Sequence, residues 1–385
     1  MKKKRDNKLL YRIYSIIFFF VCLEKINSQS DNNESSPKYE IHLKFNSIGL
    51  HSLYCDDNIN LFGTENINFY QIKENGLKIN INSLVIKESN QGICEDSIKF
   101  NINSINEIFI IEFLKSPKTL RQLFQGATIG RIERFDYPFP ENNNDFRDIF
   151  YHCIELTYVD FTKFSFSTAI EVSSMFYDNK KLETVIFPEN EQANNIEDFS
   201  DMFAYCSQLT SIDLSYFNLK KTRNMGYMFR NCYYLKSIIF SNSDKAENIK
   251  ILSSTFEGCK NLTSIDLSNF SFLKVTNMAD MFKSCSNIKS IIFPTNEKST
   301  SIQYIKNIFY GCGKLTSIDL SGLTFTKTND ISSLFEGCSN LETIALPKDE
   351  KANGIENFNK MFYGCSKLTS IDLSNISFVN AKKLN

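Results

Sequence analysis

The chain has 385 residues, and its 43 lysines and arginines nearly balance its 44 aspartates and glutamates, which gives a net charge of −1 at pH 7. This length is enough for one elongated repeat domain and a smaller N-terminal part. A near-neutral chain without a basic stripe argues against nucleic acid as a partner.

Residues 1–28 are predicted to be a secretory signal peptide. Four basic residues begin at Lys2, an eleven-residue apolar run covers 13–23, and Ile26-Asn27-Ser28 offers a cleavage site. A membrane span needs about 20 apolar residues, so this run favours a leader over an anchor. We therefore expect a protein that is secreted or held on the extracellular cell surface. Without the leader, the net charge falls from −1 to −6.

Residues 29–37 form a polar linker, and residues 38–120 then carry the apolar alternation of β-strands. We expect this part to be a β-rich cap over the N-terminal end of the repeats. No stretch after the leader is long and apolar enough to span a membrane. The expected strands cover Tyr39–Phe45, Ile67–Ile72, Leu77–Ile86, Ile98–Ile102 and Ile108–Phe113.

The cap holds two cysteines, Cys55 and Cys94. In an exported protein such a pair either forms a disulfide or stays as two thiols, and sequence alone does not decide between them. Export also makes N-x-S/T sequences candidate N-glycosylation sites. These sites are Asn33, Asn261, Asn269 and Asn375.

Residues 121–144 connect the cap to the repeats. Phe124 lies 26 residues before Phe150, the first regular marker of the repeats, but the strand positions seen later are missing. This segment is either a degenerate first repeat or a helical connector.

Residues 145–385 contain nine copies of one pattern. Each copy is marked by a phenylalanine, and the spacing alternates between 26 and 27 residues. A fixed period in this range indicates a solenoid, and the alternation indicates a 53-residue unit made of two coils. The markers are Phe150, Phe176, Phe203, Phe229, Phe256, Phe282, Phe309, Phe335 and Phe362.

An apolar residue stands four positions before each marker and, except for Thr255, one position before it, and cysteine stands three positions after it in all copies but one. This spacing is typical of one face of a helix. Glycine follows the marker by two residues in four copies, where it suits the end of a short helix. Six copies carry a candidate N-cap five residues before the marker: Asp145, Asp198, Asn224, Asn277, Asp330 and Asn357.

The pattern then changes to L-x-x-I-x-L, as in Leu209, Ile212 and Leu214, which indicates a half-buried strand. The residue between the last two apolar positions points away from the core. Along the chain this outward position alternates without exception between an acidic and an apolar residue: Asp160, Ile186, Asp213, Ile239, Asp266, Ile292, Asp319, Ala345 and Asp372.

L-x-x-I-x-L resembles the leucine-rich repeat. The longer pattern N-M-x-x-M-F-x-x-C-x-x-L-x-x-I-D-L-S-N-F resembles BspA-like surface-protein repeats and the related 26-residue repeats; its parts stand at 277–285 and 262–270. The resemblance covers roughly residues 145–385. It implies an α/β repeat solenoid, a right-handed coil stack with a parallel sheet on one face. It also implies a cell-surface binding role without catalytic residues.

Eight of the cysteines follow the repeat, and we expect them to be buried thiols. They show neither C-x-x-C nor Cys/His clustering, so no metal site is predicted. His42, His51 and His152 share no motif, and no catalytic signature is present. We therefore expect a non-enzymatic protein without a cofactor. The eight cysteines are Cys153, Cys206, Cys232, Cys259, Cys285, Cys312, Cys338 and Cys365.

The acidic and apolar alternation has two interpretations. It keeps the strand face soluble by separating like charges, or it forms a striped surface that recognises a protein or glycan partner. In the second case, charge reversal at Asp213, Asp266 and Asp319 is expected to lower partner binding and leave thermal unfolding intact. Exposed serines flank the stripe at Ser211, Ser264, Ser317 and Ser370.

Three functions follow from this pattern. The favoured one is adhesion or recognition through the strand face. The alternatives are a structural surface coat whose copies bind one another and, if the leader is not a signal peptide, an intracellular interaction scaffold. The oligomeric state stays open.

Overall fold

The computed structural model describes residues 39–46, 49–52, 67–73, 77–81, 86–89, 96–102, 108–113, 120–136, 144–189, 193–242, 244–295, 298–347 and 352–383. The predicted leader and linker, the Cys55–Cys94 pair and Asn33 lie outside these ranges. No helix among the described residues is long and apolar enough to cross a membrane.

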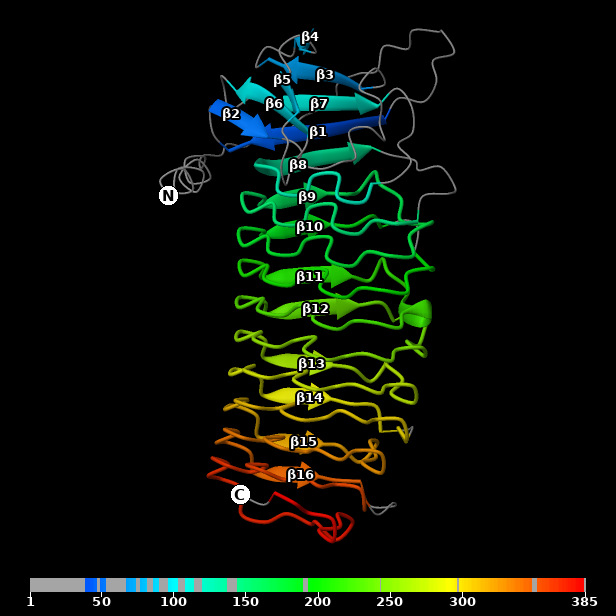
Figure 1. Cartoon of the computed structure of the whole chain (residues 1–385), viewed down its shortest axis with the longest axis vertical. Coiled ribbons are helices and arrows are strands. Elements are labelled where there is room, and N and C mark those ends of the chain that lie inside the picture. The colour runs from blue at the N-terminus through cyan, green and yellow to red at the C-terminus, as the bar shows by residue number, and fades with distance from the viewer. Residues whose placement is uncertain are drawn as a thin grey trace.

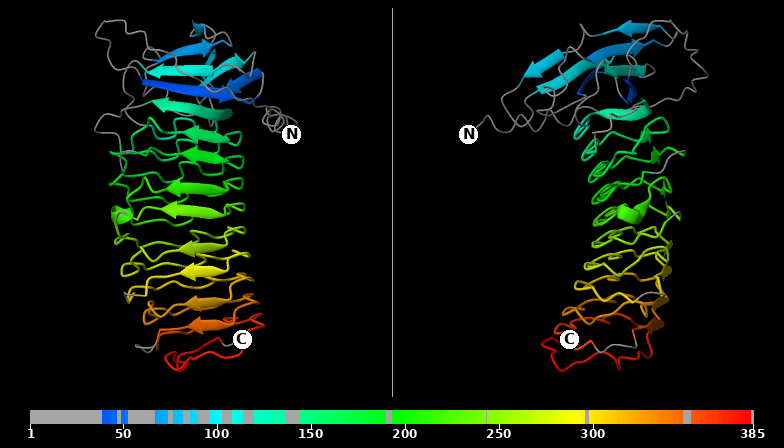
Figure 2. Two further views of the ribbon diagram at one scale, coloured as in Figure 1. Left: turned by 180° about the vertical axis from the view of Figure 1, so that it is seen from behind. Right: turned by 90° about the vertical axis from the view of Figure 1, so that its right-hand side faces the viewer.

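The fold is a β-solenoid, and this confirms the predicted repeat stack with parallel strands. Figure 1 shows an elongated pile of coils with a small group of strands at one end. Figure 2 shows from the other sides that the strands of successive coils lie one below another. These strands are β9 (Tyr158–Asp160), β10 (Thr184–Ile186), β11 (Ser211–Leu214), β12 (Ser237–Phe240), β13 (Ser264–Asp266), β14 (Ser290–Ile292), β15 (Ser317–Asp319) and β16 (Thr343–Ala345).

The N-terminal strands are mostly antiparallel, and three of them have the bounds expected from the sequence. The strands of this part are β1 (Tyr39–Phe45), β2 (Gly49–Ser52), β3 (Ile67–Ile72), β4 (Lys78–Asn80), β5 (Ile86–Ser89), β6 (Asp96–Ile102), β7 (Ile108–Phe113) and β8 (Ile129–Asp136). Strands β2, β6 and β5 form a separate three-stranded sheet.

Strand β8 joins the two parts of the molecule. One edge pairs antiparallel with β1, and the other pairs parallel with β9 in the first regular coil. A single seven-stranded sheet therefore runs in the order β10-β9-β8-β1-β7-β3-β4. The N-terminal strands thus satisfy the strand edge that the solenoid would otherwise leave open.

The solenoid strands pair two by two, which gives the 53-residue unit a structural meaning. Parallel ladders join β9 to β10, β11 to β12, β13 to β14 and β15 to β16. Each pair joins a coil with aspartate at the outward position to a following coil with isoleucine or alanine there. We call these the Asp coils and the apolar coils.

An apolar coil is joined to the next Asp coil by bridges between the segments that follow the strands, which we call the return side. Ala193 donates its N–H to Tyr216 O (3.1 Å) and accepts the N–H of Asn218 (3.0 Å). Equivalent bridges pair Ala246 with Phe270, Ser299 with Leu323 and Ala352 with Ile376. Strand ladders and return-side bridges therefore alternate along the stack.

The predicted helix in each coil is wrong. The segment around each marker is a run of tight turns, and the described residues contain only one helical element, the 3₁₀ turn η5 (Leu219–Lys221). The residues two before and two after the marker adopt left-handed backbone angles, as at Asp148 (φ 59°) and His152 (φ 59°). Two left-handed residues only four positions apart interrupt an α-helix.

Alternate N–H groups in this segment serve different partners. Tyr151 and Cys153 donate to carbonyls three residues back in their own coil, whereas Phe150 and His152 donate to Met175 and Tyr177 of the next coil. The segment therefore places apolar residues at helix-like spacing while it builds a second ladder between coils. All six predicted caps act as expected on these turns, since each Oδ1 accepts the N–H two residues on.

The marker phenylalanines form a continuous spine through the core. Ten rings, from Phe124 to Phe362, stack face to face with centroids 5.2–6.1 Å apart and interplanar angles of 1–12°. Phe124 stacks on Phe150, and Gln122 and Gly126 have the same left-handed angles as the later coils. The segment 120–126 therefore has the turn structure of a repeat, and β8 supplies its strand.

The eight repeat cysteines are free thiols, and seven of them are buried. Each Sγ donates to the carbonyl of the marker phenylalanine in the preceding coil, as Cys206 does to Phe176 O at 3.1 Å. Burial raises the pKa of the Cys153 thiol to about 12 and of Cys206 well above its usual range. These thiols are therefore protonated and unreactive at neutral pH.

We expect the buried thiols of the folded protein to resist iodoacetamide at pH 8 and to react once urea unfolds the chain. Cys365, the half-buried member of the series, should be alkylated first. Mass spectrometry of tryptic peptides over a time course measures this order. Rapid labelling of Cys232 or Cys259 in the native protein would contradict the buried register.

Asn179 occupies the cysteine position in the second coil. Its side chain is fully buried, and neither its amide nitrogen nor its amide oxygen has a hydrogen-bond partner. An unsatisfied buried polar group costs about 1–3 kcal/mol. We expect Asn179→Cys to raise the free energy of unfolding by that order, as measured by urea denaturation, because a thiol there donates as its neighbours do. Asn340→Cys, a change at a part-buried amide that already donates to Gly313 O, is the matched control and should not stabilise.

Candidate binding face

The outward side of the solenoid strands presents a regular array, which we call the strand face. Within a strand the middle residue is buried and the residues on either side of it are exposed, as in Ser264, Ile265 and Asp266. Because the pairing is in register, Ser211 lies beside Ser237 and Asp213 beside Ile239. Exposed apolar side chains stand in this array, with Ile239 54% and Ile292 51% accessible.

The structure brings the predicted face residues together. Ser211, Ser264, Ser317 and Ser370 are exposed, as are Asp213, Asp266, Asp319 and Asp372, whereas Asp160 is half-buried. The first three serines and Asp160, Asp213, Asp266 and Asp319 lie on strands, while Ser370 and Asp372 occupy the same positions of the last coil.

Each outward aspartate also holds the corner that follows its strand. Oδ1 of Asp213 accepts the backbone N–H of Ser215 at 2.8 Å, and Asp266 and Asp319 accept from the residues two positions on at 2.8 and 2.9 Å. Asp160 and Asp372 make the same bond. Such Asx turns replace a backbone hydrogen bond with a side-chain acceptor.

In three of the four apolar coils, the alternation of aspartate and apolar residues matches a difference in the corner that follows the strand. Two residues after Ile186, Ile292 and Ala345 stand Pro188, Pro294 and Pro347, whereas Ser241 follows Ile239. Proline has no N–H to donate, so an aspartate before it would have no corner to hold. The aspartates therefore have a structural role that neither interpretation from the sequence included. Their regular spacing is thus not by itself evidence of partner recognition.

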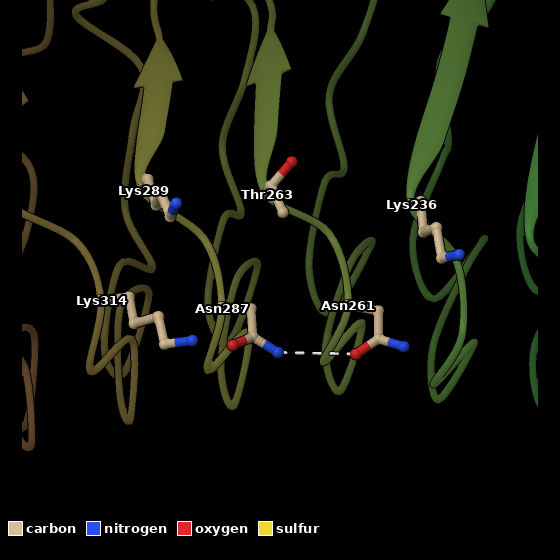
Figure 3. A pocket seen from close by; sticks show the side chains of 6 residues that line it. All are labelled: Lys236, Asn261, Thr263, Asn287, Lys289 and Lys314. Atoms are coloured by element: carbon tan, nitrogen blue, oxygen red, sulfur yellow. Dashed lines mark hydrogen bonds between the residues drawn. The ribbon is translucent and has the colours of Figure 1, made fainter.

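An open pocket of about 430 Å³ lies on this face, at the start of the strands in four adjacent coils. It is lined by Lys236, Asn261, Thr263, Asn287, Lys289 and Lys314. Figure 3 shows these side chains side by side, with Asn287 bonded to Asn261 at 3.5 Å and the ammonium of Lys314 directed toward Asn287. Thr263, Lys236 and Lys289 occupy the residue just before β13, β12 and β14.

These lysines were not predicted from the sequence. They stand at two positions of the repeat, five and seven residues after the marker phenylalanine, where the residue type varies from coil to coil. A search for residues that recur in every coil therefore does not find them. The sequence does show one sign of the pocket, a change of charge at a single repeat position. The residue before the strand in successive apolar coils is Glu183, Lys236, Lys289 and Glu342.

The other titratable groups of the described residues form ion pairs and small networks, such as that of Arg230, Glu257 and Lys283. A hydrogen bond from His42, with a further one from Lys78, lowers the pKa of Glu40 to about 2. His152 Nδ1 lies 2.7 Å from Asp178 Oδ2. Among the residues that the structure describes, no group of three or more histidine, cysteine or acidic side chains is placed to hold a metal ion.

Asp201 gives the stack a dependence on pH. Burial raises the pKa of its carboxyl to about 6, partly offset by Arg230. This pKa is above that of an aspartate in the unfolded chain, so the folded state binds the proton more tightly. The resulting contribution to the free energy of unfolding is present at low pH and is lost as the pH rises through about 6. The carboxyl is partly solvated, so we expect the loss to be of order 1 kcal/mol.

We expect Asp201→Asn to remove this loss, since asparagine does not titrate and tolerates the left-handed angle of this position (φ 56°). Thermal melts of both proteins between pH 4 and 8 measure the effect. The variant should gain stability over the wild type above pH 6 and match it near pH 4. A constant difference across this range would show that the titration of Asp201 is not the cause.

Three predicted glycosylation sites fall on described residues. The amide of Asn269 donates to Ser241 O and Asp244 O, and that of Asn375 donates to Pro347 O. Asn261 lines the pocket. Modification at these three positions stays a prediction.

The family models match the repeat region. The BspA type leucine rich repeat region, in six copies, matches residues 202–329 and 249–383. The model described as a Mycoplasma protein of unknown function matches residues 144–259. The search of curated proteins found no match.

Two solved structures are similar at low identity. One is TLR13 in its complex with ssRNA13, at 14% identity over 59% of this chain and 46% of that chain, with a TM-score of 0.25. The chain thus spans less than half the length of that TLR13 chain. The other is a leucine-rich repeat protein from Eubacterium ventriosum, at 14% identity over 61% of this chain and 83% of that chain, with a TM-score of 0.20.

BspA-type leucine-rich repeat proteins are typically non-enzymatic and generally surface-associated, with roles in protein interaction. The match over 202–383 agrees with the in-register phenylalanine, cysteine and strand positions described above. Residues 202–383 of this chain therefore match the BspA-type leucine-rich repeat, the family that the sequence pattern resembles.

Proposed function

We propose that the protein is a non-enzymatic binding protein, secreted or held on the extracellular cell surface, that recognises a protein or glycan partner through the strand face. The observation that carries the proposal is the exposed array itself. It repeats serine, aspartate and isoleucine side chains in register over successive coils.

The core makes this array rigid. The phenylalanine spine and the buried cysteines belong to the same hydrophobic core as the inward residues of the strands, which are only three or four residues long. A rigid face loses little conformational entropy when a partner binds, which favours affinity. The alternation of polar and exposed apolar side chains suits a recognition surface, because interfaces combine apolar contacts with hydrogen bonds.

The proposal is tested by the pair Ile239→Thr and Ile292→Thr in the full chain. Threonine keeps the β-branched shape that strands favour but removes exposed apolar surface. Binding is measured to immobilised matrix proteins and cell-surface glycans by surface plasmon resonance. We expect the variant to bind any partner captured by the wild type at least about tenfold more weakly.

Leu273→Thr is the matched control, since Leu273 is 46% exposed but lies outside the strands. It should bind as the wild type does. Equal partner binding by all three proteins would exclude the strand face. Light scattering over a concentration series separates partner binding from self-association, because a structural coat component would assemble as its concentration rises.

A further inference from the structure

The lysine pocket on the strand face differs in charge from the coils on either side. Outside the pocket, the lysines at the repeat position of Lys314 have an acidic partner: Lys181 pairs with Glu155 at 2.8 Å, and Lys367 lies 3.9 Å from Glu342. Within the described residues, no carboxylate lies at ion-pair distance from Lys236, Lys289 or Lys314. Three lysines without an ion-pair partner among the described residues therefore line one pocket across four adjacent coils, in a protein whose overall charge is near zero. Figure 3 shows Lys289 and Lys314 near one another and Lys236 on the other side of Thr263.

The lining groups define the chemistry of a ligand. Lysine supplies three donors and a positive charge, and the two asparagines and the threonine add neutral donors and acceptors. Asn287 already uses its amide nitrogen on Lys260 O at 2.7 Å, which fixes its side chain in place. The six lining residues include no aliphatic or aromatic side chain. Such a site suits a ligand that is anionic and polar over its whole surface.

The spacing favours an extended ligand. Lys236 and Lys289 stand two coils apart, about 10 Å at the usual distance between strands. Glu183 and Glu342 hold the same position in the next apolar coils and limit the positive stretch at both ends. Close to Lys236 in the same coil, Tyr234 exposes 48% of its surface, and an aromatic face of this kind offers an apolar surface to a sugar ring, whereas the ring of Tyr233 is covered by the ammonium of Lys260 at 4.7 Å.

We propose that this pocket binds the sulfate or carboxylate groups of an acidic glycan. A polar lining next to an exposed tyrosine favours a glycan over an acidic polypeptide, which would need apolar contacts for its other side chains. The inference rests on the proposed function, since it names the ligand class for one part of the strand face.

The test compares two triple variants of the full chain, made in bacteria so that Asn261 carries no glycan. The pocket variant is Lys236→Gln, Lys289→Gln and Lys314→Gln. The control is Lys163→Gln, Lys250→Gln and Lys327→Gln, which removes the same charge from exposed lysines outside the pocket. The probes are a heparin-derived sulfated oligosaccharide, poly-L-glutamate and neutral dextran, each titrated calorimetrically at 0.15 M salt.

We expect the wild type to bind the sulfated oligosaccharide and not dextran. The pocket variant should bind it at least about tenfold more weakly, and the control less than about twofold. An equal loss in both variants would show general electrostatic attraction and overturn the site. Tighter binding to poly-L-glutamate would assign the pocket to an acidic polypeptide, and no binding of the oligosaccharide at 0.05 M salt would also overturn the proposal.

The strand-face variant Ile239→Thr with Ile292→Thr separates the two proposals. If it loses a captured partner while no protein binds the sulfated oligosaccharide, the binding face stands and the glycan pocket fails. If oligosaccharide binding depends on the three lysines while the isoleucine variant still binds every captured partner, the pocket proposal stands. The exposed isoleucines of the strand face are then not the partner-binding site.

Discussion

Phe229→Ala is expected to lower the free energy of unfolding by about 3–5 kcal/mol, the usual cost of truncating a fully buried phenylalanine. The ring of Phe229 is 0% exposed and stacks between Phe203 at 5.6 Å and Phe256 at 5.9 Å. Its removal leaves a cavity in the middle of the stack and breaks contacts to both neighbouring coils. Urea denaturation followed by circular dichroism measures the change.

Two controls locate the effect in the spine. Tyr234→Ala removes an aromatic ring from the surface of the same coil and should cost less than about 1 kcal/mol. Phe362→Ala affects a half-buried ring with a single stacked neighbour among the described residues, so it should cost less than Phe229→Ala. If Phe229→Ala and Tyr234→Ala destabilise equally, the phenylalanines do not form the core.

The second large effect is expected for the outward aspartates. The triple change of Asp213, Asp266 and Asp319 to alanine removes three corner hydrogen bonds of 2.8–2.9 Å. At about 0.5–1.5 kcal/mol for each bond, the free energy of unfolding should fall by about 1.5–4.5 kcal/mol. The triple change to asparagine keeps the Oδ1 acceptor and removes only the charge, so it should stay within about 1 kcal/mol of the wild type.

This pair of variants also separates the corner role of the aspartates from recognition. Partner binding that falls in the asparagine variant depends on charge, whereas binding that falls only in the alanine variant reflects altered corners. Charge reversal is the weaker experiment, because lysine cannot accept the corner hydrogen bond and would change stability as well. Equal stability of the alanine and asparagine variants would contradict the Asx turns.

The sequence predicted the repeat register well, because each coil buries the same few side chains. Eight of the nine marker phenylalanines, seven of the eight repeat cysteines and the middle residue of six of the eight solenoid strands are buried as their spacing indicated. The six asparagine and aspartate caps were also found, because an Asx side chain caps a tight turn in the same way as it caps a helix.

The helix was predicted wrongly because apolar residues at i, i+3, i+4 and i+7 do not report backbone angles. Left-handed residues such as Ser254 and Tyr205 carry no sequence signal as clear as glycine does. The lysine pocket was missed for a different reason. It is formed by departures from the repeat, such as Lys236 and Lys289 at a position where the other two apolar coils hold glutamate. Its lining also comes from four coils, which only the stacking brings together.

The central claim is that the coils stack in register at one strand spacing per coil. Nitroxide labels carried by non-natural residues at Ser211 and Ser317, four coils apart, test it by electron–electron distance measurement. The stack predicts a narrow distribution near about 20 Å, and labels at Ser211 and Ser370, six coils apart, should give about 30 Å. A broad distribution, or distances that do not increase in proportion to the number of coils between the labels, would contradict the stacked solenoid.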